Sequence, residues 1–297
     1  MATFFQTLIT GLSDGSVYAS LALALVLIYK ATEVINFAQG EMAMFTTYIG
    51  WALMGHNNGT FSWWWFLVTL GIAFVFGFLI EAVVIRPLER ASVLTVVMAT
   101  IALLVILNGA AAWIWSPQLQ FFPSPFPPTT WVVGGVHISK QEVGVFGVTL
   151  ACVFILWLFF RFTKLGLAMR AGALNPGAAR LLGVRTSWLL ALGWGFAAVL
   201  GAVAGMMTVS TGTNFLSPNF MQAILIYAFA GAVLGGLESP VGAVVGGLGL
   251  GVLLAMLGQY VHPVTAELRL PVALAILLAV LLVRPAGIFG RMVVRRV

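Results

Sequence analysis

Apolar runs long enough to cross a membrane as helices recur along the whole chain, and short polar segments separate them. A helix needs about 20 apolar residues to span the hydrocarbon core, whereas a membrane β-barrel would show alternating segments of about ten residues. The pattern predicts an all-α fold, a polytopic transmembrane helical bundle. The nine expected spans are about 4–29, 36–54, 63–85, 93–115, 143–161, 188–211, 221–236, 239–258 and 268–283.

One pair of runs leaves the span count open. The run 221–236 is short for a full crossing, and only Leu237 and Glu238 separate it from the next run. The two runs either cross separately, giving nine spans, or form a re-entrant pair, giving seven. Since 61% of the residues are hydrophobic and 7% are charged, we expect a single membrane domain over residues 1–297.

The basic residues predict the orientation. With the N-terminus outside and the C-terminus inside, twelve of the fourteen Lys and Arg residues fall on the inner side, and only Lys140 and Arg269 fall outside. Inner loops of membrane proteins carry such an excess. The net charge of +6 is therefore interpreted as a topology signal, and we expect no nucleic-acid partner.

Two connections stand out by length. The segment of about 116–142 holds five prolines, which favours an outer loop because proline interrupts helices. The inner segment of about 162–187, flanked by Arg161, is rich in basic residues and has apolar positions typical of short amphipathic helices, with a break at Asn175-Pro176-Gly177. Such a segment either lies on the lipid surface or docks into another protein.

Glycines spaced four residues apart mark a helix-packing seam. In lipid, small residues at this spacing allow helix backbones to approach closely. The seam joins helices within the chain or contributes to a subunit contact. The glycines are Gly231, Gly235, Gly242, Gly246, Gly247 and Gly251.

Polar residues gather where the second span begins, in "IYKATEVINFAQGEMAMF" at 28–45. Asn36 and Gln39 share a helix face, and Glu41 points elsewhere. A carboxylate at membrane depth costs at least about 2.5 kcal/mol, so Glu41 should face protein, water or a cation. Either Asn36 caps the second helix and Glu41 meets its dipole, or the three residues form the inner gate of a translocation path.

Motifs of enzymatic chemistry are missing from the sequence. It contains no phosphate-binding loop, no HExxH, no GxSxG and no Cys/His cluster, and it has one cysteine. We expect no enzymatic activity, no cofactor and no metal. A self-contained secondary transporter remains an alternative, although ionisable residues inside the spans are few.

Several stretches together resemble the permease subunits of ABC importers for branched-chain amino acids, whose relatives carry urea and short amides. They are "GLSDGSVYASLALALVLIYKATEVINFAQGEMAMF" at 11–45, "IRPLERA" at 85–91, "GLAMRAGALNPGAARLLGV" at 166–184, "AGAVLGGLESPVGAVVGG" at 230–247 and "LLVRPAGIFG" at 281–290. The chain resembles the first of the two permease types.

The resemblance implies a multi-pass protein of the bacterial inner membrane that lies in the lipid bilayer. It implies four partner subunits: a second homologous permease, two cytosolic ATP-binding subunits, which hydrolyse ATP, and an extracytoplasmic solute-binding protein. It further implies that the inner segment docks into the ATPase. The coupling candidates are Arg170, Asn175, Arg180 and Gly183. Two questions stay open. The solute is either a branched-chain amino acid or urea and short amides, and the two permeases pair either as a heterodimer or as a homodimer.

Overall fold

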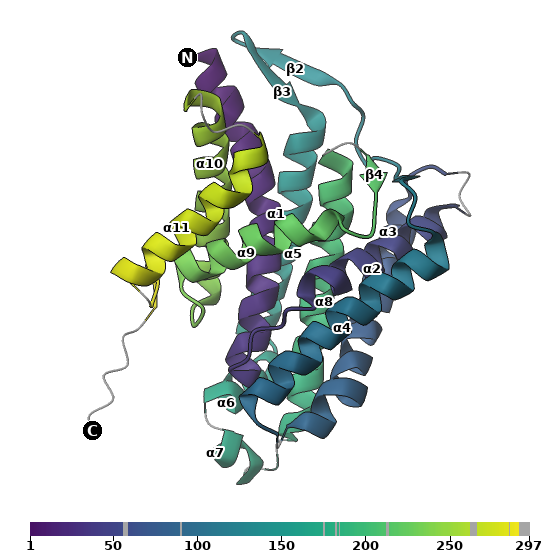
Figure 1. The fold of residues 1–297 in the computed structure, drawn as a ribbon, viewed down its shortest axis with the longest axis vertical. Helices are drawn as coiled ribbons and strands as arrows, with labels where there is room; N and C mark the ends of the chain where they lie inside the picture. The colour runs from purple at the N-terminus through teal and green to yellow at the C-terminus, as the bar shows by residue number, and fades with distance from the viewer. Residues whose placement is uncertain are drawn as a thin grey trace.

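The chain folds into a bundle of helices with two short β-pairs at one end (Figure 1). The computed structural model describes residues 1–55, 59–89, 91–174, 176–181, 183, 185–211, 214–261, 266–284 and 286–290. The helices are α1 (Ala2–Thr32), α2 (Gln39–Gly55), α3 (Trp63–Ile80), α4 (Val93–Trp115), α5 (Lys140–Phe162), α6 (Lys164–Leu174), α7 (Pro176–Leu181), α8 (Thr186–Thr211), α9 (Phe220–Gly235), α10 (Pro240–Tyr260) and α11 (Arg269–Val283).

The helical bundle confirms the predicted all-α membrane class. Within the described residues, six helices are long and apolar enough to cross a membrane, and α9 and α11 are shorter apolar helices. The six are α1, α3 with its continuation to Leu88, α4, α5, α8 and α10. The predicted count of nine and the predicted orientation stay predictions.

Helices α1 and α8 form the centre of the bundle and are the most buried of the long helices. They are joined by a hydrogen bond in which the Ser20 hydroxyl donates to the Leu200 carbonyl, 3.1 Å away. Helices α4 and α5 each bury only four side chains and leave the others partly or fully exposed. Because these exposed side chains are apolar, they suit contact with lipid.

Helix α2 begins inside the bundle rather than at its end. After α1 ends at Thr32, the chain turns back beside α1 before α2 starts at Gln39 (Figure 1). The side-chain amide of Gln39 reaches the carbonyl of Ala197, near the middle of α8. The expected span 36–54 is therefore a short helix preceded by a non-helical segment in the interior.

The proline-rich segment contains three of the four strands in the described part of the chain. Strands β2 (Thr130–Val133) and β3 (Val136–Ser139) form a hairpin, and Gly134 and Gly135 in its turn both have positive φ, as a two-residue hairpin loop requires. Strand β1 (Gln120–Phe121) pairs with β4 (Phe215–Leu216). This second pair fastens the segment of about 116–142 to the α8–α9 connection.

The C-terminal end of α3 continues irregularly through a π-helical turn, η1 (Glu81–Ile85), and a 3₁₀ turn, η2 (Arg86–Leu88). The fully buried Glu81 accepts a hydrogen bond from Arg86 at 2.8 Å, and the two form an ion pair. Pairing is the expected state of a carboxylate taken out of water, because an isolated buried charge is costly.

Candidate functional site

Asn36 and Gln39 tie the start of α2 to α8. The side-chain oxygen Oδ1 of Asn36 accepts from the Ala38 backbone amide at 3.0 Å, a capping contact to the turn that leads into α2. The Asn36 side-chain amide donates to the Gln39 oxygen at 3.2 Å, and the Gln39 amide donates to the Ala197 carbonyl at 2.9 Å. Both side chains are buried, so this chain of hydrogen bonds fixes the interior end of α2.

Glu41 faces away from that chain of bonds and towards α4. Its side chain is 2% exposed and accepts from the Asn108 amide of α4 at 3.2 Å. The same Asn108 nitrogen lies 3.1 Å from both the Pro218 carbonyl and the Asn219 side-chain oxygen. The two hydrogens of the Asn108 amide are thus shared among three acceptor oxygens. These contacts join α2, α4 and the start of α9.

The set of polar side chains around Glu41 extends to the surface of the chain. Gln222 donates to the Asn219 side-chain oxygen at 3.0 Å. Asn219 and Gln222 are exposed, whereas Glu41 is buried. We call Glu41, Asn108, Asn219 and Gln222 the Glu41 cluster. It leads from a buried carboxylate to the surface of the chain.

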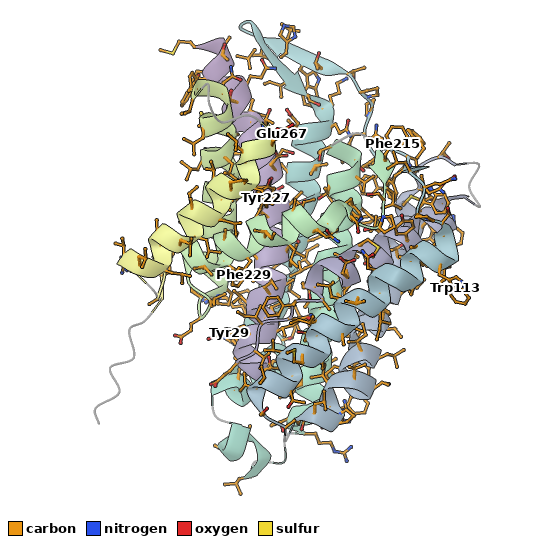
Figure 2. All side chains as sticks on the ribbon, viewed as in Figure 1. Tyr29, Trp113, Phe215, Tyr227, Phe229 and Glu267 are labelled. Atoms are coloured by element: carbon orange, nitrogen blue, oxygen red, sulfur yellow. The ribbon has the colours of Figure 1, made fainter. Side chains whose placement is uncertain are left out.

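The surroundings of the cluster are apolar and aromatic. Tyr227 and Phe229 follow it along α9, and Trp113 projects from the end of α4 (Figure 2). Polar side chains that open onto lipid are unfavourable. The exposed amides therefore suit a face covered by water or by another protein. Within the described residues, no three His, Cys, Asp or Glu side chains are placed to hold a metal ion.

The seam glycines lie where three helices meet. A Cβ at Gly235 would overlap the backbone of Gly242, and one at Gly246 would overlap the Gly231 carbonyl, so α9 and α10 are in backbone contact.

The other side of α10 packs on α1. A Cβ at Gly247 would lie 2.5 Å from the Cα of Ala19, and one at Gly251 would overlap the Cα of Gly15. All six predicted seam glycines are thus buried in contacts within the chain.

The inner segment forms two short helices separated at residue 175. Arg170 on α6 is exposed, and its guanidinium lies 3.5 Å from the Arg161 carbonyl. Gly183 follows α7 with φ of +80° and has open space around it. Asn175 lies outside the described residues, as does the side chain of Arg180 on α7. Of the four coupling candidates, the structure therefore describes the surroundings of Arg170 and Gly183 only.

Sequence reasoning missed three members of the Glu41 cluster. Asn108 interrupts an otherwise apolar run, a signal that could have found it, since polar residues inside spans are rare. Asn219 and Gln222 sit in an ordinary helix-start context, and only the packing of α9 against α2 and α4 brings them to Glu41.

Comparisons with known proteins agree on one family. The model described as branched-chain amino acid transport system, permease component, matches residues 7–281. The high-affinity branched-chain amino acid transport system permease protein LivH of Escherichia coli K12 is 32% identical over 311 residues, which cover 99% of this chain and 98% of LivH. BraD of Pseudomonas aeruginosa, described in the same words, is 32% identical over 312 residues, with the same coverage of each chain.

A more distant relative is the probable branched-chain amino acid transport permease protein LivH of Methanocaldococcus jannaschii. It is 29% identical over 287 residues, which cover 91% of this chain and 87% of the relative. The comparison with solved structures gave no significant match. The full-length similarity and the helical bundle together confirm the resemblance noted in the sequence: this chain belongs to the family of permease components of branched-chain amino acid transport systems.

Proposed function

We propose that the chain is a membrane-spanning permease of an ATP-driven importer for branched-chain amino acids. It forms the translocation path with a second homologous permease in the bacterial inner membrane, with its N-terminus outside and its C-terminus inside. Two cytosolic ATP-binding subunits supply the energy, and an extracytoplasmic solute-binding protein delivers the solute. Family membership supports the permease role.

The Glu41 cluster is the observation that supports a translocation path along one particular face of the chain. A buried carboxylate is linked through Asn108 to exposed Asn219 and Gln222 on an apolar surface. Short helices that begin inside the membrane and present polar groups there are typical of transport sites. In this proposal the face bearing Asn219 and Gln222 meets the second permease, and Glu41 stabilises the ammonium group of a passing amino acid.

Asn36 and Gln39 have a supporting role in this proposal. They hold the interior end of α2 against α8, so that movement of α8 is passed to Glu41 two residues further along. The inner-gate role then belongs to the start of α2 as a unit.

The inner segment of about 162–187 is the coupling element of this proposal. Leu181 at the end of α7 is 91% exposed, and it lies among basic residues at one end of the bundle (Figure 1). An exposed leucine on a short helix suits a cleft in a partner protein. Gly183 allows the chain to leave the docked helix through a positive φ that other residues adopt with strain.

Substitution of Leu181 by serine is expected to reduce solute-stimulated ATP hydrolysis by the assembled importer about tenfold. Burying a leucine side chain in a partner contributes about 1.5–3 kcal/mol, and this contribution is lost, whereas the folded chain alone loses nothing because Leu181 is already exposed. The measurement is ATPase activity in proteoliposomes. Leu119→Ser, at a 64% exposed leucine in the predicted outer loop, is the control. Equal activities in the two variants would contradict the docking role.

Solute uptake tests the proposal as a whole. Cells lacking the gene are expected to lose high-affinity uptake of radiolabelled leucine and to regain it on complementation. Excess valine or isoleucine should compete, and urea or acetamide should not. Competition by urea alone would move the assignment to the urea and short-amide importers. Unchanged leucine uptake when ATP is depleted would instead favour a secondary transporter.

A further inference from the structure

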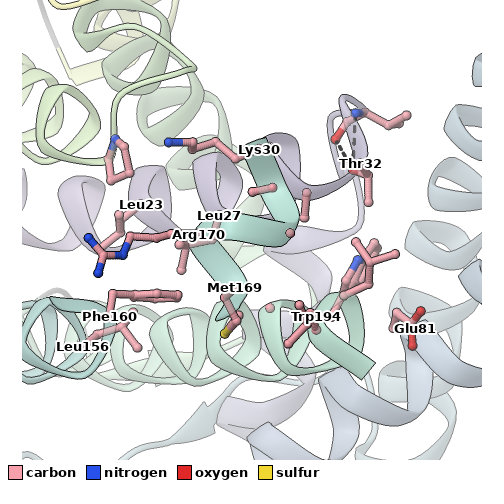
Figure 3. A pocket seen from close by; sticks show the side chains of 18 of the residues that line it. Leu23, Leu27, Lys30, Thr32, Glu81, Leu156, Phe160, Met169, Arg170 and Trp194 are labelled. Carbon is pink, nitrogen blue, oxygen red and sulfur yellow. Dashed lines mark hydrogen bonds between the residues drawn. The ribbon is translucent and has the colours of Figure 1, made fainter. Parts of the chain in front are cut away.

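A large cavity in the described part of the chain lies away from the Glu41 cluster. It has a volume of about 990 Å³, near the upper end of the roughly 300–1,000 Å³ range of ligand pockets. Helices α1, α4, α5, α6, α8 and α10 surround it together with η1. Most of its lining is apolar and includes Leu23, Leu27, Leu156, Phe160, Met169 and Trp194 (Figure 3). An apolar chain would fit such a lining.

The cations that line the cavity gather at one end. Lys30 of α1 and Arg170 of α6 extend toward the same end of the cavity, and Glu81 lies at the other end (Figure 3). Glu81 is neutralised by Arg86 at 2.8 Å, the only ion pair among the described residues. Lys30 and Arg170 are exposed and have no carboxylate partner within that part of the chain. Their charges are therefore available to an anion.

Two of the remaining polar groups of the lining, on Arg161 and Trp194, fit the same ligand. Arg161 also lines the cavity, with its guanidinium 5.6 Å from the centre of the Trp157 ring. The Nε1 of Trp194, a side chain 1% exposed, has no hydrogen-bond partner among the described residues. An ester carbonyl would give this N–H the acceptor that a plain hydrocarbon lacks. Glu89 is a further lining residue and is exposed.

We infer that this cavity binds an anionic phospholipid of the inner leaflet. The acyl chains occupy the apolar part, and the phosphate is held by Lys30, Arg161 and Arg170. Basic pockets between transmembrane helices on the cytoplasmic side bind acidic headgroups in this way. The lipid would connect α6 of the inner segment to α1 and α10, and its binding is independent of which solute is transported.

The test is lipid titration of the purified, delipidated full chain followed by native mass spectrometry. Phosphatidylglycerol is compared with phosphatidylcholine carrying identical acyl chains, and inorganic phosphate is added as a competitor. The chain is expected to bind phosphatidylglycerol more tightly, and K30Q/R170Q to bind it roughly 25-fold more weakly, about fivefold for each cation. Lys140→Gln, at the hairpin end of α5, removes a single positive charge away from the cavity and should bind as the unmodified chain does.

A second variant tests the cavity itself. Val241 lines the cavity and is 59% exposed, so Val241→Trp fills space without overpacking the core. It should reduce binding of both lipids while Lys30 and Arg170 remain. Equal affinity of the unmodified chain for the two lipids, or unchanged binding by K30Q/R170Q, would overturn the inference. Displacement of the lipid by millimolar inorganic phosphate would assign the cations to a free phosphate instead.

Discussion

Replacing Gly251 by alanine is expected to lower the stability of the bundle by about 1–3 kcal/mol, the usual cost of inserting a group into a packed core. The new Cβ would overlap the Cα and amide nitrogen of Gly15 on α1. Backbone atoms cannot rotate away as a side chain can, so α1 and α10 must separate. Gly247 packs against Ala19 in the same contact surface. Separation of the two helices therefore weakens the packing along the whole α1–α10 pair.

The matched control is Gly249→Ala on the same helix. Gly249 is exposed, and a Cβ there would meet nothing within 4 Å, so the higher helix propensity of alanine should leave stability equal or slightly raised. Thermal unfolding of both variants in the same detergent, followed by intrinsic tryptophan fluorescence, makes the comparison. If Gly251→Ala unfolded at the same temperature as Gly249→Ala, close packing of α1 on α10 would be refuted.

The second large effect is expected at Glu41. Glu41→Gln should lower leucine uptake at least tenfold while the assembled importer forms in normal amounts. Glutamine keeps an oxygen to accept from Asn108, so the link between α2 and α4 is retained. It loses the negative charge, and a hydrogen bond to a charged group contributes about 1.5–3 kcal/mol. Uptake into right-side-out vesicles with a defined internal ATP supply measures the change.

Glu238→Gln serves as the control for charge removal, because Glu238 is exposed in the turn between α9 and α10. It should transport normally. Unimpaired transport by Glu41→Gln would exclude the carboxylate from the path. Failure of that variant to assemble would instead assign Glu41 a structural role in joining α2 to α4.

Local patterns in the sequence predicted the helical elements well because a membrane span needs a continuous apolar run. Helix α6 ends at Leu174 and α7 begins at Pro176, so Pro176 and Gly177 lie inside α7 and not in the predicted break. The short run 221–236 is a short helix, α9. The glycine spacing indicated close helix contact but not the partner. Gly251 meets Gly15 across more than two hundred residues, and no local pattern carries that information.

The sequence was less informative about the candidate site. It predicted the second span from residue 36, and it could not show that α2 begins beside the middle of α8, because that position depends on the Gln39–Ala197 hydrogen bond. The Glu41 cluster unites residues from three separate helices. Its assembly depends on how α9 packs, so Asn219 and Gln222 carried no signal of their own.

The most direct test of the importer is purification of the tagged chain from its native membrane in mild detergent, followed by mass spectrometry of the proteins that accompany it. We expect a second permease of the same family and two ATP-binding subunits in stoichiometric amounts. Reproducible isolation of the chain alone, or only with copies of itself, would contradict the account if this preparation still takes up leucine after reconstitution. That result would favour a self-contained transporter.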